Sequence, residues 1–540
     1  MDNGTFDRDF ASLFEPRTIA VIGASNVPGK WGFIIPVNIL VGGFRGRILM
    51  VNPGERSVLG FPAYSSIKDI EEQVDLVFVT IPAVGVLDVI KDAAATGVKN
   101  VVVISSNFSE VGGEGVELER RLADFANDAG MTIVGPNTMG IYSASASLCG
   151  VGSPIVPLTG GVGFVSQSGN LGVQLLGWGK SRGVGFSRFV GSGNAANTDM
   201  DDYLAYLGED PLTRVIALYV EGLKDGKRFL EVAKRITPYK PIVVLKGGRG
   251  KLGGRAARSH SGAMAGQLEL FEGMFEQAGI VEAQHSEEFI DIVAAFDALP
   301  PAAGKRVAIM TMGGGWGVVA VDACEREGLE LARLPQTAID EIDKVLPSYW
   351  SRGNPVDLVG NLRRSSHFRT IDVLAACDEV DILIVMGVLL GKGLLTDMLL
   401  HGAVKPFFSM LRRHTRRLPS FMFSQWKAMA DPRFNKKGNR DRKHLGGSSG
   451  INPAEAWLWT DTALTRRLQK LVEKTGKPII AVAMDEREMA TAARLQSRGI
   501  FSAPTPERAV RAAAKIAEYG TSPMKNSSVS RSLRGQRRRG

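Results

Sequence analysis

Cysteine, long apolar runs and metal-ligand spacings are scarce in this sequence. The 540 residues include only Cys149, Cys324 and Cys377, which are far apart, so we expect neither a disulfide framework nor a metal site. The longest apolar run, Ile382–Leu390, is too short to span a bilayer, and the acidic start MDNGTFDRDF lacks the apolar core of a signal peptide. We therefore expect a cytoplasmic protein without a membrane span.

The composition is typical of a large globular protein. Hydrophobic residues make up 44% of the chain and charged residues 22%, and the mean hydropathy is +0.02, which excludes a disordered chain. A length of 540 residues leaves room for about three or four domains.

The net charge of +9 is concentrated in two segments. Residues 401–450 sum to +10 and residues 521–540 to +6, so the rest of the chain sums to −7. We interpret 401–453 as a basic insertion and 521–540 as a disordered basic tail. Because the body is mildly acidic, we expect no specific nucleic-acid partner.

Runs rich in Val, Ile and Leu recur along the chain, each followed by a glycine-marked turn and an amphipathic stretch. This pattern is typical of βαβ units with buried parallel strands. It predicts three α/β domains, at 1–145, 155–300 and 304–520. Candidate strands of the first are Thr18–Ile22, Arg47–Val51, Asp75–Thr80, Val101–Ser105 and Thr132–Val134, with a helix at Glu114–Ala129. Those of the second are Gly163–Ser166, Arg214–Val220 and Pro241–Lys246, with a helix near Glu287–Leu299; those of the third are Arg306–Thr311, Ile382–Met386 and Pro478–Ala483.

The turn after the first strand, GASNVPGKWG, is the first candidate binding site. It contains Gly23, Ala24, Ser25 and Lys30, and its glycines and the following helix start suit a phosphate. The second strand ends in Asn52-Pro53-Gly54 instead of the acid that would hold the ribose of NAD. A nucleotide-like ligand other than NAD is favoured, with a tight turn that binds nothing as the alternative.

The run Ser166-Gln167-Ser168-Gly169 joins an apolar strand to a helix and predicts an anion cradle. A hydrolase nucleophile elbow would need glycine where Ser166 stands. The alternative is that Ser168 only caps the helix.

His260 is the candidate phosphate acceptor, because it lies in SHSGAMAG among small residues and follows Arg249, Arg255 and Arg258. An imidazole used as a nucleophile benefits from a carboxylate that orients its second nitrogen. Glu221, at the end of a predicted strand, is the best-placed candidate. The alternatives are a structural histidine and a surface carboxylate.

Together these runs resemble the NDP-forming acyl-CoA synthetase family, in particular the alpha subunit of ADP-forming acetate–CoA ligases, and more distantly succinyl-CoA synthetase alpha. The matching runs are VIGASNVPGKWG, VNPG, VDLVFVTIPA, VVVISSNFSEVGGEG, VGPNTMG, FVSQSGNLG, GSGNAANTDMDDYL, YVEGLKDGKRF, SHSGAMAG, MGGGWGVVAVDACEREGLEL, GNPVDLVG and TPERAV. They cover roughly residues 10 to 400 and 455 to 519.

The resemblance implies a CoA-binding Rossmann-like domain followed by two flavodoxin-like domains like those of succinyl-CoA synthetase. It implies that His260 is phosphorylated, that Glu221 stabilises it, and that Ser166–Gly169 bind phosphate. The CoA site that it implies consists of Gly23, Ala24, Ser25, Lys30, Asn52, Pro53, Ile81, Pro82, Ala83, Asn107, Pro136 and Asn137. It further implies acyl-CoA and an organic acid as substrates, and an ATP-grasp beta subunit, on a separate chain, that holds ATP or ADP with Mg²⁺.

The sequence departs from the usual family pattern where CoA is expected. Gly54 replaces a lysine, Thr138 replaces a cysteine, and SSNF at 105–108 replaces SAGF. These changes keep a rival hypothesis open, a non-catalytic subunit that senses CoA or acyl-CoA. A nicotinamide-dependent oxidoreductase is a weaker third choice.

Overall fold

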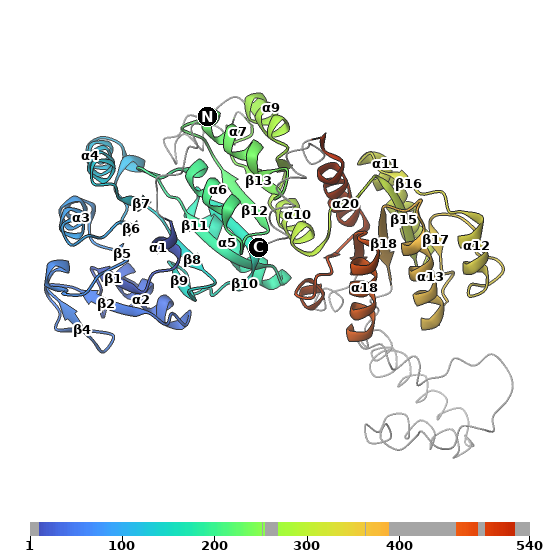
Figure 1. The fold of residues 1–540 in the computed structure, drawn as a ribbon, viewed down its shortest axis with the longest axis horizontal. Helices are drawn as coiled ribbons and strands as arrows, with labels where there is room; N and C mark the ends of the chain where they lie inside the picture. The colour runs from blue at the N-terminus through green and yellow to red at the C-terminus, as the bar shows by residue number, and fades with distance from the viewer. Residues whose placement is uncertain are drawn as a thin grey trace, which may run out of the picture.

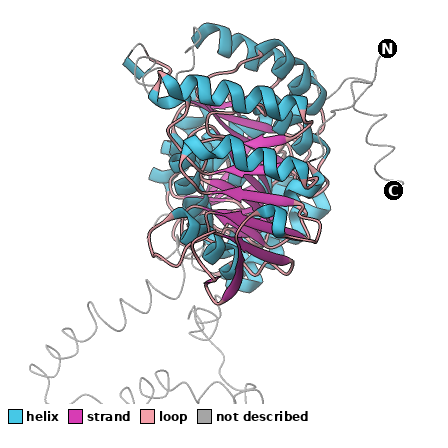
Figure 2. Cartoon of the chain, turned by 90° about the vertical axis from the view of Figure 1, so that its left-hand side faces the viewer, coloured by secondary structure: helices cyan, strands magenta, loops and turns pink. Residues whose placement is uncertain are grey.

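The computed structural model describes residues 10–250, 252–253, 268–361, 363–387, 461–483 and 492–523. They form three α/β units that lie in a row (Figure 1). Figure 2 faces the first unit and shows helices on both sides of its strands. The α/β class predicted from the sequence is therefore confirmed. Within the described ranges, no helix is long and apolar enough to cross a membrane.

The first unit is a doubly wound sheet with the order β3-β4-β2-β1-β5-β6-β7 in the described residues. Its strands are β1 Thr18–Ile22, β2 Arg47–Val51, β3 Ser57–Val58, β4 Phe61–Tyr64, β5 Leu76–Val79, β6 Asn100–Val103 and β7 Thr132–Val134. Its helices are α1 Ala11–Phe14, α2 Trp31–Val41, α3 Val86–Ala95 and α4 Glu114–Asp128, with short 3₁₀ turns at Ile67–Asp69, Ala83–Gly85 and Ser109–Val111. β1 is buried along its whole length, because it lies at the centre of a sheet covered on both faces.

The second unit has the sheet order β14-β13-β12-β10-β11-β8-β9 in the described residues. Its strands are β8 Gly140–Ser143, β9 Leu148–Val151, β10 Leu158–Ser166, β11 Gly185–Gly191, β12 Val215–Val220, β13 Ile242–Lys246 and β14 Val281–Ala283. Its helices are α5 Gly169–Arg182, α6 Met200–Glu209, α7 Gly226–Ile236, α9 Leu268–Ala278 and α10 Ser286–Ala298.

The hairpin β8–β9 belongs to the second sheet, because β8 pairs antiparallel with β11. The sequence placed β8 before a domain boundary at residue 145 and β9 in a linker. Its two strands have four residues each and read GIYS and LCGV. They contain no Val and Ile run of the kind that marked the other strands.

The third unit has the sheet order β16-β15-β18-β19-β20, with β17 paired to β15. Its strands are β15 Arg306–Thr311, β16 Glu330–Leu331, β17 Val356–Asp357, β18 Ile382–Met386, β19 Ile479–Val482 and β20 Ser502–Ala503. Its helices are α11 Gly314–Arg326, α12 Gln336–Asp343, α13 Arg364–Ala376, α18 Asp461–Thr475 and α20 Pro506–Thr521. The predicted basic insertion at 401–453 and residues 524–540 of the predicted tail lie outside the described residues.

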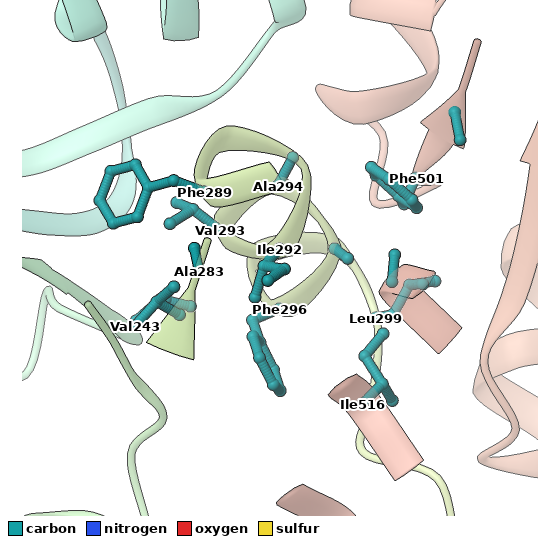
Figure 3. Close-up of a cluster of buried hydrophobic side chains, with 14 of the residues drawn as sticks. Val243, Ala283, Phe289, Ile292, Val293, Ala294, Phe296, Leu299, Phe501 and Ile516 are labelled. Carbon is teal, nitrogen blue, oxygen red and sulfur yellow. The ribbon is translucent and has the colours of Figure 1, made fainter. Parts of the chain in front are cut away.

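Continuous apolar cores join the three units. Figure 3 shows α10 between the second sheet and the third unit, with Phe289 directed toward the sheet. Phe296 of α10 meets Tyr519 of α20 edge to face at 5.3 Å between ring centroids. At the other side, Phe14 of α1 stacks on Tyr206 of α6 at 4.9 Å. The units are therefore packed against one another through hydrophobic side chains.

Candidate active site

The turn after β1 brings the backbone close to the start of α2. Gly23 has φ of +86° and a Cβ added there would lie 2.7 Å from Cγ2 of Ile81, so a side chain at this position would be strained. A Cβ on Gly32 would lie 1.9 Å from the carbonyl oxygen of Gly23. Lys30 precedes α2 and makes no side-chain cap bond. The first N–H groups of α2 therefore have no side-chain cap.

The turn after β2 is fastened to the turn after β1. Asn52 Nδ2 donates to the carbonyl of Ala24 at 2.7 Å, and Asn52 Oδ1 accepts from Gly54 N at 2.8 Å. A Cβ on Gly54 would meet only Asn52 Oδ1, at 3.5 Å. This position thus has room for a β-carbon.

The turns after β5, β6 and β7 lie along the same edge, because these strands run parallel to β1. Ser105 Oγ donates to the carbonyl of Ile81 at 2.5 Å, and Asn137 N donates to the carbonyl of Ser105 at 2.8 Å. Asn107 N donates to Glu110 Oε1 at 2.6 Å. The predicted CoA residues, including Pro53, Pro82, Ala83 and Pro136, are therefore brought to the carboxyl ends of neighbouring strands.

A polar network that the sequence did not reveal joins this edge to the second unit. Asn194 Nδ2 donates to Glu110 Oε2 at 2.6 Å and to Glu119 Oε2 at 2.7 Å. Asn194 Oδ1 accepts from Asn137 Nδ2 at 3.3 Å. The paired residues are 57 to 84 positions apart in the sequence, so no local sequence pattern predicts this junction.

Thr138 has a structural role at the same junction. Its hydroxyl donates to the carbonyl of Gly191 and accepts from Gly140 N, the latter at 2.9 Å. Its side chain is buried. The hydroxyl therefore ties β7 to the start of β8 and the end of β11, which accounts for threonine at this position.

The predicted anion cradle lies at the end of β10 and the start of α5. Ser168 precedes α5 but its hydroxyl caps no helix N–H, so helix capping does not explain it. Ser166 is fully buried and its hydroxyl donates to the carbonyl of Ser168 at 2.7 Å. The positive end of the α5 dipole thus faces the turn that contains Ser168 and Gly169.

Gln167 is engaged by its neighbours. Its Oε1 accepts from the backbone N–H groups of Glu221 at 2.5 Å and Gly222 at 3.0 Å. Its Nε2 donates to the carbonyl of Gly222 at 2.7 Å. The structure therefore places its amide on the strand end that carries Glu221, while its backbone stays in the turn that is predicted to bind phosphate.

Glu221 follows β12 and is 7% exposed. Ser166 pairs with Tyr219 in the register of β10 and β12, so the cradle and Glu221 end adjacent strands. Burial, with the charge of Glu221 close by, raises the pKa of Tyr219. Lys246 at the end of β13 donates to the carbonyl of Glu221 at 2.9 Å. Burial lowers the pKa of Lys246, and Glu221 opposes part of this change.

His260 lies outside the described residues. The chain reaches its segment from the end of β13, which pairs with β12, and returns at Leu268 in α9. Arg249, counted among the basic groups that attract an anion, is paired instead with Glu282 and, at 2.9 Å, with Glu272. These two ion pairs therefore neutralise much of the charge of Arg249 within the protein.

A cavity of about 420 Å³ opens between α4, α6 and α7, and none of the predicted site residues lines it. Asp201 lines it, is 3% exposed and pairs with Arg228. Burial, with Asp202 nearby, raises the pKa of Asp201 to about 6. Among the described residues no group of His, Cys, Asp and Glu has an arrangement that could hold a metal ion.

Three protein families match successive parts of the chain. The CoA binding domain matches residues 17–144, the succinyl-CoA ligase like flavodoxin domain matches 159–296, and the Ligase-CoA domain matches 307–389. The fold, the site and these matches define a protein with a CoA-binding domain and succinyl-CoA ligase-like flavodoxin domains.

Individual relatives narrow this class. The chain is 40% identical over 372 residues to the alpha subunit of ADP-forming acetate–CoA ligase II of Pyrococcus furiosus, covering 69% of this chain and 81% of that one. It is 39% identical over 372 residues to ADP-forming acetate–CoA ligase I of Archaeoglobus fulgidus, but spans only 54% of that longer protein. Acetyl-coenzyme A synthetase 1 of Ca. Korarchaeum cryptofilum, solved with phosphate and ADP, superposes with a TM-score of 0.77 at 30% identity, covering 98% and 99% of the two chains. The chain belongs to the NDP-forming acyl-CoA synthetase family.

Proposed function

We propose that this chain is the alpha-type subunit of an NDP-forming acyl-CoA synthetase. It interconverts acyl-CoA, phosphate and ADP with an organic acid, CoA and ATP. One observation carries the proposal: the cradle Ser166–Gly169 and Glu221 end adjacent strands, next to the strand from which the chain enters the His260 segment. Phosphoryl transfer to a histidine needs the anion, the base-orienting carboxylate and the acceptor to meet, and the shared edge of these strands supports such a meeting.

The carboxyl edge of the first sheet fits CoA. The uncapped N–H groups at the start of α2 suit an acceptor oxygen of CoA, and the space beside Gly54 is open at the distance of a β-carbon. When bound, CoA supplies the thioester that makes the acyl carbon reactive. Gly23 and Ala24 let it approach the backbone closely.

In the direction of ATP formation, a phosphate oxygen attacks the thioester carbon and the C–S bond breaks. CoA leaves as the thiol with a proton from phosphate, and an acyl phosphate remains. A nitrogen of His260 then attacks phosphorus, and the acid leaves as its carboxylate. The start of α5 and the Ser168 hydroxyl stabilise the negative charge that develops on the phosphoryl oxygens.

The phosphoryl group then passes from His260 to ADP, which breaks the N–P bond and restores the neutral imidazole. We propose that ADP and Mg²⁺ are held by an ATP-grasp beta subunit on a separate chain. The alpha-subunit name of the Pyrococcus furiosus relative supports a partner of this kind. We place the reaction in the cytoplasm, and the three free, buried cysteines fit a reducing compartment.

The proposal is tested by the mass of the protein, purified with the chains that accompany it, after incubation with phosphate and a panel of acyl-CoAs. Wild type should gain one acid-labile phosphoryl group on the peptide that contains His260, and ADP should remove it. His260→Asn should gain none, while the matched control His285→Asn should behave as wild type. If wild type binds CoA but is never phosphorylated by any acyl-CoA, the chain is a sensing subunit and the proposal fails.

A further inference from the structure

Two large apolar side chains meet where the first and second units join. Trp31 lies in the first turn of α2 and is 39% exposed. A Cβ added to Gly152 would lie 2.8 Å from Cζ3 of Trp31 and 3.1 Å from Cε of Met139. The indole ring and the thioether therefore both cover Gly152, and only glycine fits beneath them.

Met139 also reaches the anion cradle. A Cβ added to Gly169, the first residue of α5, would lie 2.6 Å from Cγ of Met139. The backbone holds this contact in place, because Gly152 N donates to the carbonyl of Met139 at 2.8 Å. Trp31, Met139 and Gly152 thus form a wall, hereafter the Trp31–Met139 wall, that runs from the start of α2 to the start of α5.

The chemistry of the proposed reaction fixes what must lie beside this wall. CoA is held at the first unit and phosphate at the start of α5, and the attacked carbon must lie within roughly 3 Å of a phosphate oxygen. The substituent on that carbon therefore leaves the reacting centre next to Gly169, where Met139 is the neighbouring side chain. The indole of Trp31 is 39% exposed, so covering it with apolar atoms would be favourable because apolar surface is removed from water.

We propose that the Trp31–Met139 wall binds the acyl tail and selects carboxylic acids whose tail is apolar. The inference rests on the proposed function and names its substrate class. The wall offers a ring face and a thioether, and neither pairs with a second carboxylate. A dicarboxylic acid would have to desolvate its distal charge against them, which is costly.

The test compares butyryl-CoA with succinyl-CoA, which have the same chain length and differ in the terminal carboxylate. The rate and the KM of protein phosphorylation by each are measured with excess phosphate, on the protein purified with its accompanying chains. Wild type should prefer butyryl-CoA. Trp31→Ala and Met139→Ala should each lower the ratio of kcat/KM for butyryl-CoA to that for succinyl-CoA by about tenfold or more. Trp31→Phe, which keeps an aromatic face, should recover most of the preference.

Leu40→Ala is the matched control, since Leu40 is equally exposed on the same helix and lies about 14 Å further along it. Its ratio should equal that of wild type. Thermal melting checks that each variant is folded, and Met139→Leu replaces Met139→Ala if the latter is not. If wild type is phosphorylated but both wall variants keep its ratio, the inference is wrong and the proposed function stands. If no acyl-CoA phosphorylates wild type, the proposed function fails and the inference fails with it.

Discussion

Replacing Gln167 by methionine separates two roles for this side chain. The sequence includes Gln167 in the run predicted to bind phosphate, and its side-chain amide makes three hydrogen bonds to the backbone of Glu221 and Gly222. Methionine has a similar shape and can make none of them. Gln167→Met should therefore act by displacing Glu221 and should leave the phosphate-binding turn intact.

The magnitude follows from those bonds. Each contributes roughly 0.5–1.5 kcal/mol net, and the site is only part-buried, so water replaces some of what is lost. We expect the free energy of unfolding to fall by about 2 kcal/mol. A shift of about 1 Å in a group that orients the nucleophile costs on the order of 100-fold in rate, so the rate of phosphorylation should fall by about 10- to 100-fold.

The assay is single-turnover phosphorylation by acyl-CoA at varied phosphate concentration, with urea denaturation on the same samples. The rate should drop while the apparent KM for phosphate stays within about threefold of wild type. Gln167→Glu keeps both acceptor bonds and loses the donor, so its phosphorylation rate should lie between those of wild type and Gln167→Met. Gln174→Met, on the exposed side of α5, should change nothing. A KM for phosphate that rises about tenfold at unchanged rate would refute the reasoning, because Gln167 would then be a phosphate ligand.

Two further predictions concern stability. Asp291 is almost buried between Arg508, at 2.6 and 2.9 Å, and Arg182, at 3.1 Å. Asp291→Ala should therefore lower the free energy of unfolding, measured in urea, by about 3 kcal/mol. Glu518→Gln, at an exposed site on α20, should leave it unchanged, and equal effects of the two variants would contradict a stabilising role for the Asp291 ion pairs. Burial raises the pKa of Asp201 in the folded protein from 3.8 to about 6, so its contribution to stability is full below pH 4 and is lost as pH rises to 6. The stability of wild type relative to Asp201→Asn should therefore fall by about 3 kcal/mol over that range. A difference that is flat or rises with pH would show that burial is not the main cause of the pKa shift.

Strands with unbroken Val and Ile runs were predictable to the residue, as β1, β2 and β18 show. β11 was not, because its sequence GFSRFVG contains Ser187 and Arg188. Both are buried, and the charge of Arg188 is met by Glu15 at 2.8 Å. A strand whose polar side chains find partners 173 residues away has no local signature.

The candidate site was likewise predictable only in part. The turns that follow strands were predictable, since the carboxyl ends of parallel strands share one edge and glycines mark the turns. Their partners were not. The Gln167 amide and the Arg249 guanidinium are each bound by groups of the protein that only the fold brings near, and the sequence does not predict these contacts.

The hairpin β8–β9 affects whether the second unit can exist by itself. Although it follows the first sheet directly in the chain, it covers the outer side of β11, which is buried along its whole length. A fragment cut at residue 155 would keep β11 and lose its cover. The bare strand would then offer its unpaired N–H and carbonyl groups, between apolar faces, to any other strand, including that of a second copy. A fragment that contains the second unit should therefore begin before residue 140, where the chain passes from the first sheet to the second. It then keeps β8 and leaves no unpaired edge on β11.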